Sequence, residues 1–190
     1  MRFRLNRKRF DDYEPNPSAK LGKSLDIHRI FNQSDFDEGN DGGCQSAAIF
    51  ECLEAKIGKD VSMTAMREWY FRMDRFWKGK GEHLETAVKF AEKFGVTTDD
   101  MNFAIKDVKK IAPRDISFER VKSACAEFDA VVVAIGTRGS TFFSPMTGKL
   151  YKEFSIPGIH GMRVAGDYPT GDLCFQNSWG ESWGANGRRS

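Results

Sequence analysis

Apolar residues recur at helical spacing along the first half of the chain. The clearest such segment begins at Cys44, contains few charged residues and ends before Gly58, and glycine commonly terminates helices. This composition predicts a mostly buried helix with Cys44 in its first turn. Four segments have the spacing of helices: 44–57, 62–77, 82–94 and 117–127.

Beyond residue 128 the pattern changes to short apolar runs separated by glycine, proline and aspartate. The run 130–135 is too apolar for a strand with one face in water, which predicts a buried strand. The helix-then-strand order predicts an α+β fold in which residues 24–190 form one domain, mainly helical over 24–112 and mainly β over 113–190. Further strand candidates are 142–143, 150–151, 161–165 and 173–176.

The first 23 residues, 1–23, are expected to form a basic arm outside this domain. The first ten residues contain five arginines or lysines and no acidic residue, whereas the whole chain has a net charge of only +2. Pro15 and Pro17 resist regular structure. Such an arm can bind a protein partner through its charge, and we expect no nucleic-acid binding except through it.

Composition narrows the class of protein. With 190 residues, 40% of them hydrophobic, the chain is long enough to bury a core. No apolar run has the length of a membrane span, and the N-terminus lacks the apolar stretch of a secretory signal peptide. The four cysteines have no paired short spacing, which argues against a metal site or a disulfide framework. We therefore expect no metal or other cofactor, and a location in the cytoplasm or inside a larger assembly such as a virion.

Three residues far apart in the sequence have the types needed for nucleophilic catalysis. Cys44 opens a helix, whose N-terminal dipole stabilises a thiolate. Gly42 and Gly43 leave the approach open to a substrate backbone, and the amide of Cys44 is a candidate oxyanion donor. His160 precedes an apolar strand, and Asn177 can accept a ring N–H and orient the imidazole. Each residue alone also fits a purely structural role.

The segments around these residues resemble the motifs of papain-like (C1 family) cysteine peptidases. Residues 37–44 are similar to the family's nucleophile segment, and residues 159–162 to its histidine strand. Residues 176–187 are similar to its Asn-Ser-Trp-Gly signature, which is the most specific of the three motifs. The resemblance extends from residue 25 to residue 187, with the motifs in the family's order.

The resemblance implies a two-lobe fold with a polypeptide substrate bound between the lobes. A helical lobe would carry Cys44 on its central helix, and an antiparallel β-barrel-like lobe would carry His160 and Asn177. By the same resemblance, the catalytic residues are Cys44, His160 and Asn177, and the substrate-binding residues are Gly42, Gly43, Gly81, Gly158 and Trp179.

Glu38 is the departure from the family that bears most on activity. It stands where the family has a glutamine whose side-chain amide donates to the oxyanion hole, beside the amide of Cys44. An ionised carboxylate there repels developing negative charge, and losing such a donor typically costs roughly 100- to 1,000-fold in turnover. A protonated Glu38 can still donate, and burial near a thiolate favours the protonated form. The hypothesis is that catalytic activity is weak at neutral pH or is favoured by acid.

Two further departures concern the branch of the family and the C-terminal edge. Asp41 replaces a cysteine, and Gln45 a tryptophan, of the secreted plant and lysosomal members, so the chain is more similar to a disulfide-free microbial or viral type. The sequence ends shortly after Gly187, where relatives continue into another strand. This predicts a missing C-terminal strand and an open sheet edge, which a protein partner can cover.

The leading hypothesis is a cysteine peptidase, a thiol hydrolase that cleaves peptide bonds through a Cys44–His160 thiolate–imidazolium pair and a thioester. The alternative is a catalytically weak or inactive papain-fold component of a larger assembly. A third possibility is transamidation, or removal of ubiquitin-like modifiers, with the same three residues. The presence of all three favours catalysis, whereas Glu38 favours the inactive alternative.

Overall fold

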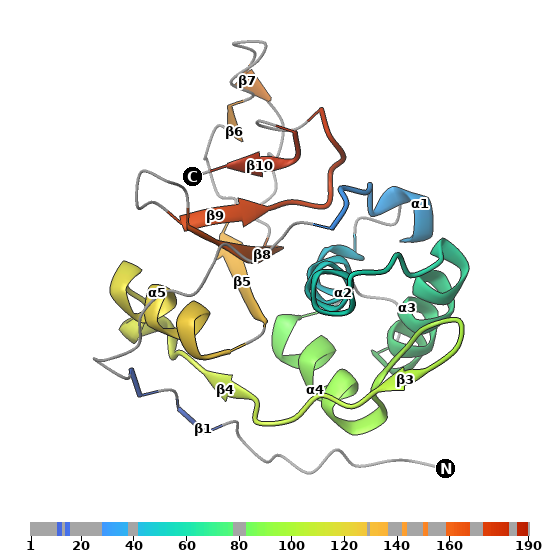
Figure 1. Cartoon of the computed structure of the whole chain (residues 1–190), viewed down its shortest axis with the longest axis horizontal. Coiled ribbons are helices and arrows are strands. Elements are labelled where there is room, and N and C mark those ends of the chain that lie inside the picture. The colour runs from blue at the N-terminus through green and yellow to red at the C-terminus, as the bar shows by residue number, and fades with distance from the viewer. Residues whose placement is uncertain are drawn as a thin grey trace.

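Helices predominate over strands in the first half of the chain and strands over helices in the second, as a computed structural model shows (Figure 1). The structure describes residues 11–12, 14–15, 28–37, 42–77, 83–128, 130–136, 142–143, 150–151, 159–167, 173–182 and 186–189. The candidate site residues Glu38, Gly81 and Gly158 lie outside the described residues.

The four helices predicted from apolar spacing are confirmed to within two residues at each end. They are α2 (Cys44–Ile57), α3 (Met63–Trp77), α4 (Leu84–Phe94) and α5 (Phe118–Glu127). The short helix α1 (Ser34–Asp37) and the 3-10 turn η1 (Pro113–Asp115) were not predicted, because neither is long enough to have a periodic pattern.

Four strands form the main sheet, in the antiparallel order β10-β9-β8-β5. They are β5 (Val131–Gly136), β8 (Ile159–Asp167), β9 (Leu173–Gln176) and β10 (Arg188–Arg189). The other strands have two residues each: β1 (Asp11–Asp12), β2 (Val96–Thr97), β3 (Asn102–Phe103), β4 (Lys109–Lys110), β6 (Phe142–Phe143) and β7 (Leu150–Tyr151).

The edge of β9 is paired, which corrects the expectation of an open edge after Gly187. Arg188 lies opposite Gln176 and Arg189 opposite Phe175 in antiparallel register. Gly187 has a φ of +73°, a conformation that glycine adopts without strain, and this turn brings the last residues back onto β9. Two residues are too few to give a strand pattern in the sequence, so the pairing was invisible there.

Helix α2 is the central element of the fold. It packs against β8 and β5 on one side and against α3 and α4 on the other, as Figure 1 shows with α2 seen end-on. Because neighbours surround it, even its polar residues Gln45, Glu51 and Glu54 are buried. Its last turn ends at Gly58, which has a left-handed φ of +63° and donates its N–H to the carbonyl of Glu54.

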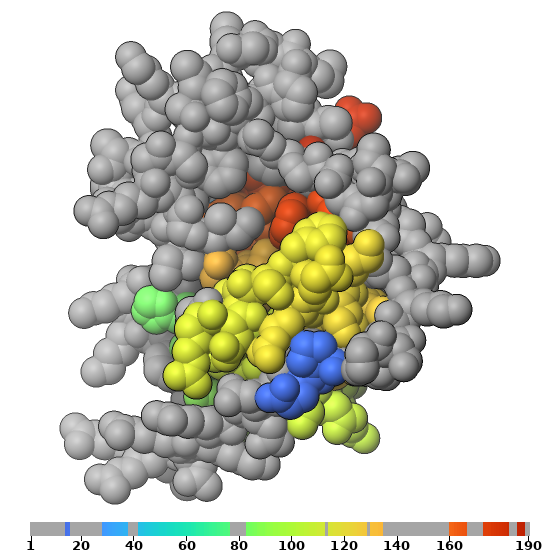
Figure 2. Space-filling model, turned by 90° about the vertical axis from the view of Figure 1, so that its left-hand side faces the viewer, coloured from blue at the N-terminus to red at the C-terminus, as the bar shows by residue number. Residues whose placement is uncertain are grey.

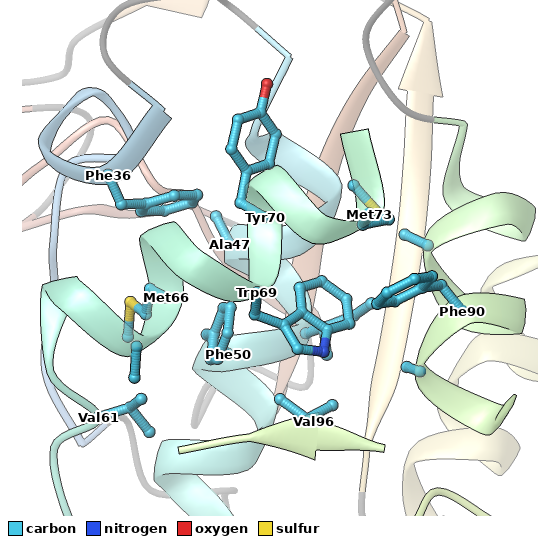
Figure 3. Close-up of a cluster of buried hydrophobic side chains, with 14 of the residues drawn as sticks. Phe36, Ala47, Phe50, Val61, Met66, Trp69, Tyr70, Met73, Phe90 and Val96 are labelled. Carbon is cyan, nitrogen blue, oxygen red and sulfur yellow. The ribbon is translucent and has the colours of Figure 1, made fainter. Parts of the chain in front are cut away.

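Separate hydrophobic cores lie on the two sides of α2. In the helical core, Trp69 packs edge-to-face on Phe50 and Phe90 (Figure 3), and its indole N–H donates to the carbonyl of Gly95. Aromatic pairs of this geometry add stabilisation beyond the area that they bury. The second core is smaller and joins α5 to the main sheet through Val121, Cys125, Val164 and Leu173. The architecture is therefore a helical layer and a sheet layer that meet at α2.

Part of the N-terminal arm lies against the folded domain. β1 pairs in parallel with β4, so two aspartates run beside two lysines. Glu14 Oε2 also lies 3.8 Å from Nη2 of Arg120 on α5, and Figure 2 shows a short blue segment of the arm next to the yellow part of the chain. The attached part of the arm is thus acidic, unlike the first ten residues.

No helix among the described residues is long and apolar enough to cross a membrane.

Candidate functional site

Cys44 is the first residue of α2 and is 6% exposed. Gly43 precedes it at the N-cap, and no side chain caps the helix there. The first turn of α2 itself contains no acidic residue, and the carboxylate of Asp37 lies against the amide of Gly43 just before it. A helix N-terminus is in general a position that favours the thiolate form of a cysteine.

The segment before Cys44 is held by the carboxylate of Asp37, which is 1% exposed. Asp37 Oδ2 accepts the backbone N–H of Gly43 at 3.2 Å and the side-chain N–H of Gln33 at 3.3 Å. A Cβ built on Gly43 would lie 2.8 Å from that oxygen and 2.9 Å from the Asp37 Cβ. Only glycine fits between this carboxylate and the nucleophile.

His160 and Asn177 form a direct hydrogen bond in a buried setting. His160 Nε2 lies 2.6 Å from Asn177 Oδ1, and the two residues are 6% and 1% exposed. Because an amide oxygen only accepts, Nε2 is assigned the proton, which leaves Nδ1 as the basic nitrogen. Burial lowers the pKa of His160, and the bond to Asn177 raises it again in part. Asn177 thus both orients the ring and favours its charged form.

Trp179 packs on the imidazole of His160. The two ring centroids are 4.5 Å apart with an interplanar angle of 40°. Trp179 is half-buried, and its backbone forms an isolated antiparallel β-bridge with Asn32, which lies just before α1. The indole therefore shields the hydrogen bond between His160 and Asn177 from water, which strengthens that bond.

Gln33 joins the loop after Asn177 to the segment before Cys44. Its backbone N–H donates to the carbonyl of Ser178 at 2.7 Å, and its side-chain oxygen accepts from the Ser178 hydroxyl at 2.8 Å. Its side-chain nitrogen donates to Asp37, which in turn binds Gly43. This Gln33–Asp37–Ser178 clamp fixes the segment that precedes Cys44 relative to the loop that follows Asn177.

Gly161 brings the histidine strand onto the first turn of α2. A Cβ built on it would lie 3.1 Å from the carbonyl oxygen of Cys44 and 2.7 Å from Cδ of Gln45. The residue next to His160 is thus in van der Waals range of the backbone of Cys44. Close approach of this kind is a common reason for glycine inside a strand.

Among the predicted site residues, His160 is hydrogen-bonded to Asn177 and stacked by Trp179, while Gly43 and Cys44 open α2, whose first turn Gly161 touches. The sequence did not single out Gln33, Asp37 or Gly161. Glycine directly after His160 in an apolar strand was the available signal for Gly161. Nothing in the sequence pattern marks Gln33 or Asp37, because their partners are distant in the sequence.

The described residues contain no group of three or more His, Cys, Asp or Glu placed to hold a metal ion. All four cysteines are buried, and none forms a disulfide. The candidate reactive groups predicted from the sequence are a thiol, an imidazole and a carboxamide.

Comparison with solved structures shows the fold. The chain is similar to xylellain, a cysteine protease from Xylella fastidiosa, with a TM-score of 0.64 and 14% identity over 94% of this chain and 83% of that one. It also resembles a mite-allergen structure related to Blo t 1 and Der p 1 (TM-score 0.53, 17% identity, 94% and 68% covered). A third match is the digestive procathepsin L2 proteinase from Tenebrio molitor larval midgut (TM-score 0.53, 15% identity, 94% and 67% covered).

At these identities the likeness shows the fold alone: the chain has a papain-like, two-lobe α+β fold. Neither a protein-family model nor a curated protein matches the sequence.

Proposed function

We propose that this chain is a cysteine peptidase in which Cys44 is the nucleophile, His160 the general base and acid, and Asn177 the residue that orients His160. One observation carries the proposal. His160 lies on β8 and forms a 2.6 Å hydrogen bond with Asn177. The residue that follows His160, Gly161, abuts the backbone of Cys44 at the start of α2. A thiol at a helix N-terminus beside an oriented imidazole is the arrangement that cysteine catalysis needs.

The proposed reaction has two steps. In acylation, the Cys44 thiolate attacks the peptide carbonyl carbon, and the tetrahedral intermediate expels the amine, which takes the proton from His160 Nδ1. In deacylation, His160 removes a proton from water, the hydroxide attacks the thioester carbonyl, and Cys44 leaves as thiolate. The backbone N–H of Cys44 is the proposed oxyanion donor in both steps.

The identity of residue 38 sets the expected rate. We retain the proposal that Glu38 occupies the second oxyanion-hole position and donates only when protonated. Activity would then be weak at pH 7 and favoured in acid. The Glu38→Gln variant should raise kcat/KM at pH 7 and flatten the pH profile between 5 and 7, and an unchanged rate at pH 7 would refute this part of the proposal.

The decisive experiment combines thiol labelling with product analysis. The intact chain is treated with iodoacetamide and with an epoxide inhibitor at pH 5 to 7, and in parallel with a peptide library read by mass spectrometry. The proposal expects fast labelling at Cys44 and cleaved peptides, both lost in Cys44→Ala. Labelling of Cys44 at the rate of an ordinary thiol, with no cleavage, would identify the inactive alternative.

The same experiment separates peptidase from transferase activity. Added amine nucleophile should leave the cleavage products unchanged if water deacylates the thioester. Products that carry the amine would instead indicate transamidation, and selective release of a ubiquitin-like modifier would indicate deconjugation.

Further parts of the proposal concern the setting of the enzyme. A polypeptide substrate is proposed, with Gly42, Gly43, Gly81, Gly158 and Trp179 as its binding residues. The absence of disulfides among the four cysteines fits a disulfide-free, microbial or viral type that works in the cytoplasm or in an assembly such as a virion. We also propose the division into an arm (1–23) and a peptidase domain (24–190, with lobes 24–112 and 113–190), and a protein partner for the basic arm.

A further inference from the structure

The buried side chain of Gln33 joins two segments that are 145 residues apart in the sequence and that flank the candidate site. Its oxygen accepts the hydroxyl of Ser178 at 2.8 Å. Its nitrogen donates to Oδ2 of Asp37 at 3.3 Å, and the same carboxylate oxygen accepts the N–H of Gly43 at 3.2 Å. Both polar atoms of this carboxamide are therefore paired, as a buried amide requires.

Backbone hydrogen bonds also join the segment 31–33 to the loop 178–180. The N–H of Gln33 donates to the carbonyl of residue 178 at 2.7 Å, and the N–H of Gly180 donates to the carbonyl of Phe31 at 3.2 Å. These two bonds do not depend on which side chain stands at position 33. The side chain of Gln33 extends this backbone pairing to the carboxylate that holds the N-cap of α2.

Both ends of the His160–Asn177 hydrogen bond are thereby tied to the start of α2. On the histidine side, the next residue, Gly161, lies against the carbonyl of Cys44. On the carboxamide side, the clamp joins the residue after Asn177 to the segment that precedes Cys44. One contact leaves a rotation about it open, whereas contacts at both ends of the bond fix its position and its direction.

We propose that Gln33 is a positioning residue for the Cys44 site. Its two side-chain hydrogen bonds keep the loop after Asn177, and with it the ring of His160, in place relative to the first turn of α2. The proposal rests on the proposed function of this site, and Gln33 itself acts through other residues. A misplacement of about 1 Å between reacting groups typically costs on the order of 100-fold in rate, so a tie of this kind bears directly on activity.

Amide hydrogen exchange tests the tie without reference to catalysis. Gln33→Met removes both side-chain bonds at similar length, and Ser178→Ala removes the hydroxyl but leaves the backbone bond. In both variants the N–H of Gly43, measured by NMR, should exchange at least about tenfold faster than in the wild type, because opening of that segment then costs less free energy. The N–H of Gly95, which donates to the carbonyl of Ala91 at 2.8 Å in the helical lobe, should keep its wild-type rate.

Steady-state kinetics tests the consequence for the reaction. Gln33→Met and Ser178→Ala should each lower kcat roughly 10- to 100-fold with KM little changed. The double variant should match Gln33→Met, since both changes break one connection.

Gln33→Glu provides a readout that a merely space-filling side chain would not move. The new carboxyl keeps an acceptor for the Ser178 hydroxyl, but it can donate to Asp37 only when it is protonated. When ionised, it places a second negative charge against that carboxylate. The kcat of Gln33→Glu, divided by the wild-type kcat at the same pH, should therefore fall as pH rises from 5 to 7.

Ser62→Ala is the matched control for loss of stability. The Ser62 hydroxyl accepts the N–H of Ala65 at 3.1 Å at the start of α3, away from the clamp. This variant should lower Tm but leave kcat and the exchange rate of Gly43 at their wild-type values. If Gln33→Met does not fold, Ser178→Ala and Gln33→Glu carry the test.

The outcomes distinguish this inference from the proposed function. If the wild type cleaves no peptide and Cys44 is alkylated only as fast as in the urea-unfolded chain, the proposed function fails. Exchange then decides: a wild-type rate at Gly43 in Ser178→Ala overturns the inference, and a faster rate supports Gln33 as the residue that couples the two segments. If the wild type is active, a wild-type kcat in Gln33→Met, or an equal loss of kcat in Ser62→Ala, shows the inference to be wrong.

Discussion

At the residue scale, the site depends on two glycines that leave room for polar groups. Gly43 lies against Asp37, and Gly161 lies against Cys44 and Gln45. Neither has a left-handed φ, so the glycine is required for space and not for backbone freedom. A substitution at either position should therefore displace its neighbours and alter the site before it alters the rest of the fold.

Gly161→Ala tests this requirement directly. The new methyl group would push β8 away from the first turn of α2, and the move displaces His160 from Cys44. We expect kcat/KM to fall at least about tenfold, with KM little changed, because geometry and not substrate contact is affected. Steady-state kinetics measures kcat and KM separately. A wild-type kcat in Gly161→Ala would contradict the prediction. Met162→Leu, one residue further on, is the volume-conserving control.

Asn177 provides a prediction about the pH profile. Its hydrogen bond raises the pKa of His160 against the effect of burial. Asn177→Ala should lower that pKa, so the thiolate–imidazolium pair is lost at lower pH and the alkaline limb of Cys44 alkylation moves down. Asn177→Asp places a negative charge on the same ring nitrogen and should move the limb up. Alkylation rates from pH 5 to 9 measure both variants, and shifts of the same sign would be inconsistent with this role.

At the scale of elements, helices were predictable because their apolar spacing and their stop signals agree. Gly58 and Gly95 end α2 and α4 where the sequence indicates, and Ser117 caps α5 by accepting the N–H of Arg120. The two-residue strands β1, β4 and β10 were not predictable, because each exists only through pairing with a distant segment.

The end of α2 provides an element-scale prediction. Gly58 has a φ of +63°, and a Cβ there would meet no atom within 4 Å, so the cost of a side chain is backbone strain alone. Gly58→Ala should lower the free energy of unfolding by about 1 kcal/mol. Gly58→Asn should cost less, since asparagine tolerates this conformation. Urea unfolding measures both, and Cys44 reactivity should stay at the wild-type level, because Gly58 lies at the far end of the helix.

At the scale of the whole molecule, buried carboxyl groups between the two layers couple stability to pH. Burial raises the pKa of Glu51 and of Glu54 above the ordinary value of 4.5, with Arg163 and Arg29 acting in the opposite direction. The folded chain therefore holds these protons more tightly than the unfolded chain. Their contribution is complete below pH 4.5 and is lost as pH rises through the folded-state pKa values.

The expected result is a stability maximum in mild acid. Glu85 acts in the other direction: hydrogen bonds from Lys89 and Lys110 lower its pKa to about 2, so its contribution is lost as pH falls from 4.5 toward 2. Glu85 is well exposed, which limits that contribution to less than about 1 kcal/mol. Urea unfolding from pH 4 to 8 should show a decline toward neutral pH that Glu51→Gln reduces. An equal slope in that variant would contradict the assignment to Glu51.

The sequence by itself determined the helices, the strands β5 and β8, and the three residue types of the candidate site. These features are local: spacing, stop signals and short motifs express them without reference to distant residues. The expectation of a buried strand over 130–135 was wrong: β5 is half-buried, with Ala134 exposed, because it is an outer strand of the sheet. Only the tertiary structure decided that His160 bonds to Asn177 and that the strand carrying His160 packs on the first turn of α2. Gly161 on Cys44 and Gln33 between Asp37 and Ser178 each join segments far apart in the sequence. Such contacts follow from packing of α2 against the sheet, and no local pattern encodes them.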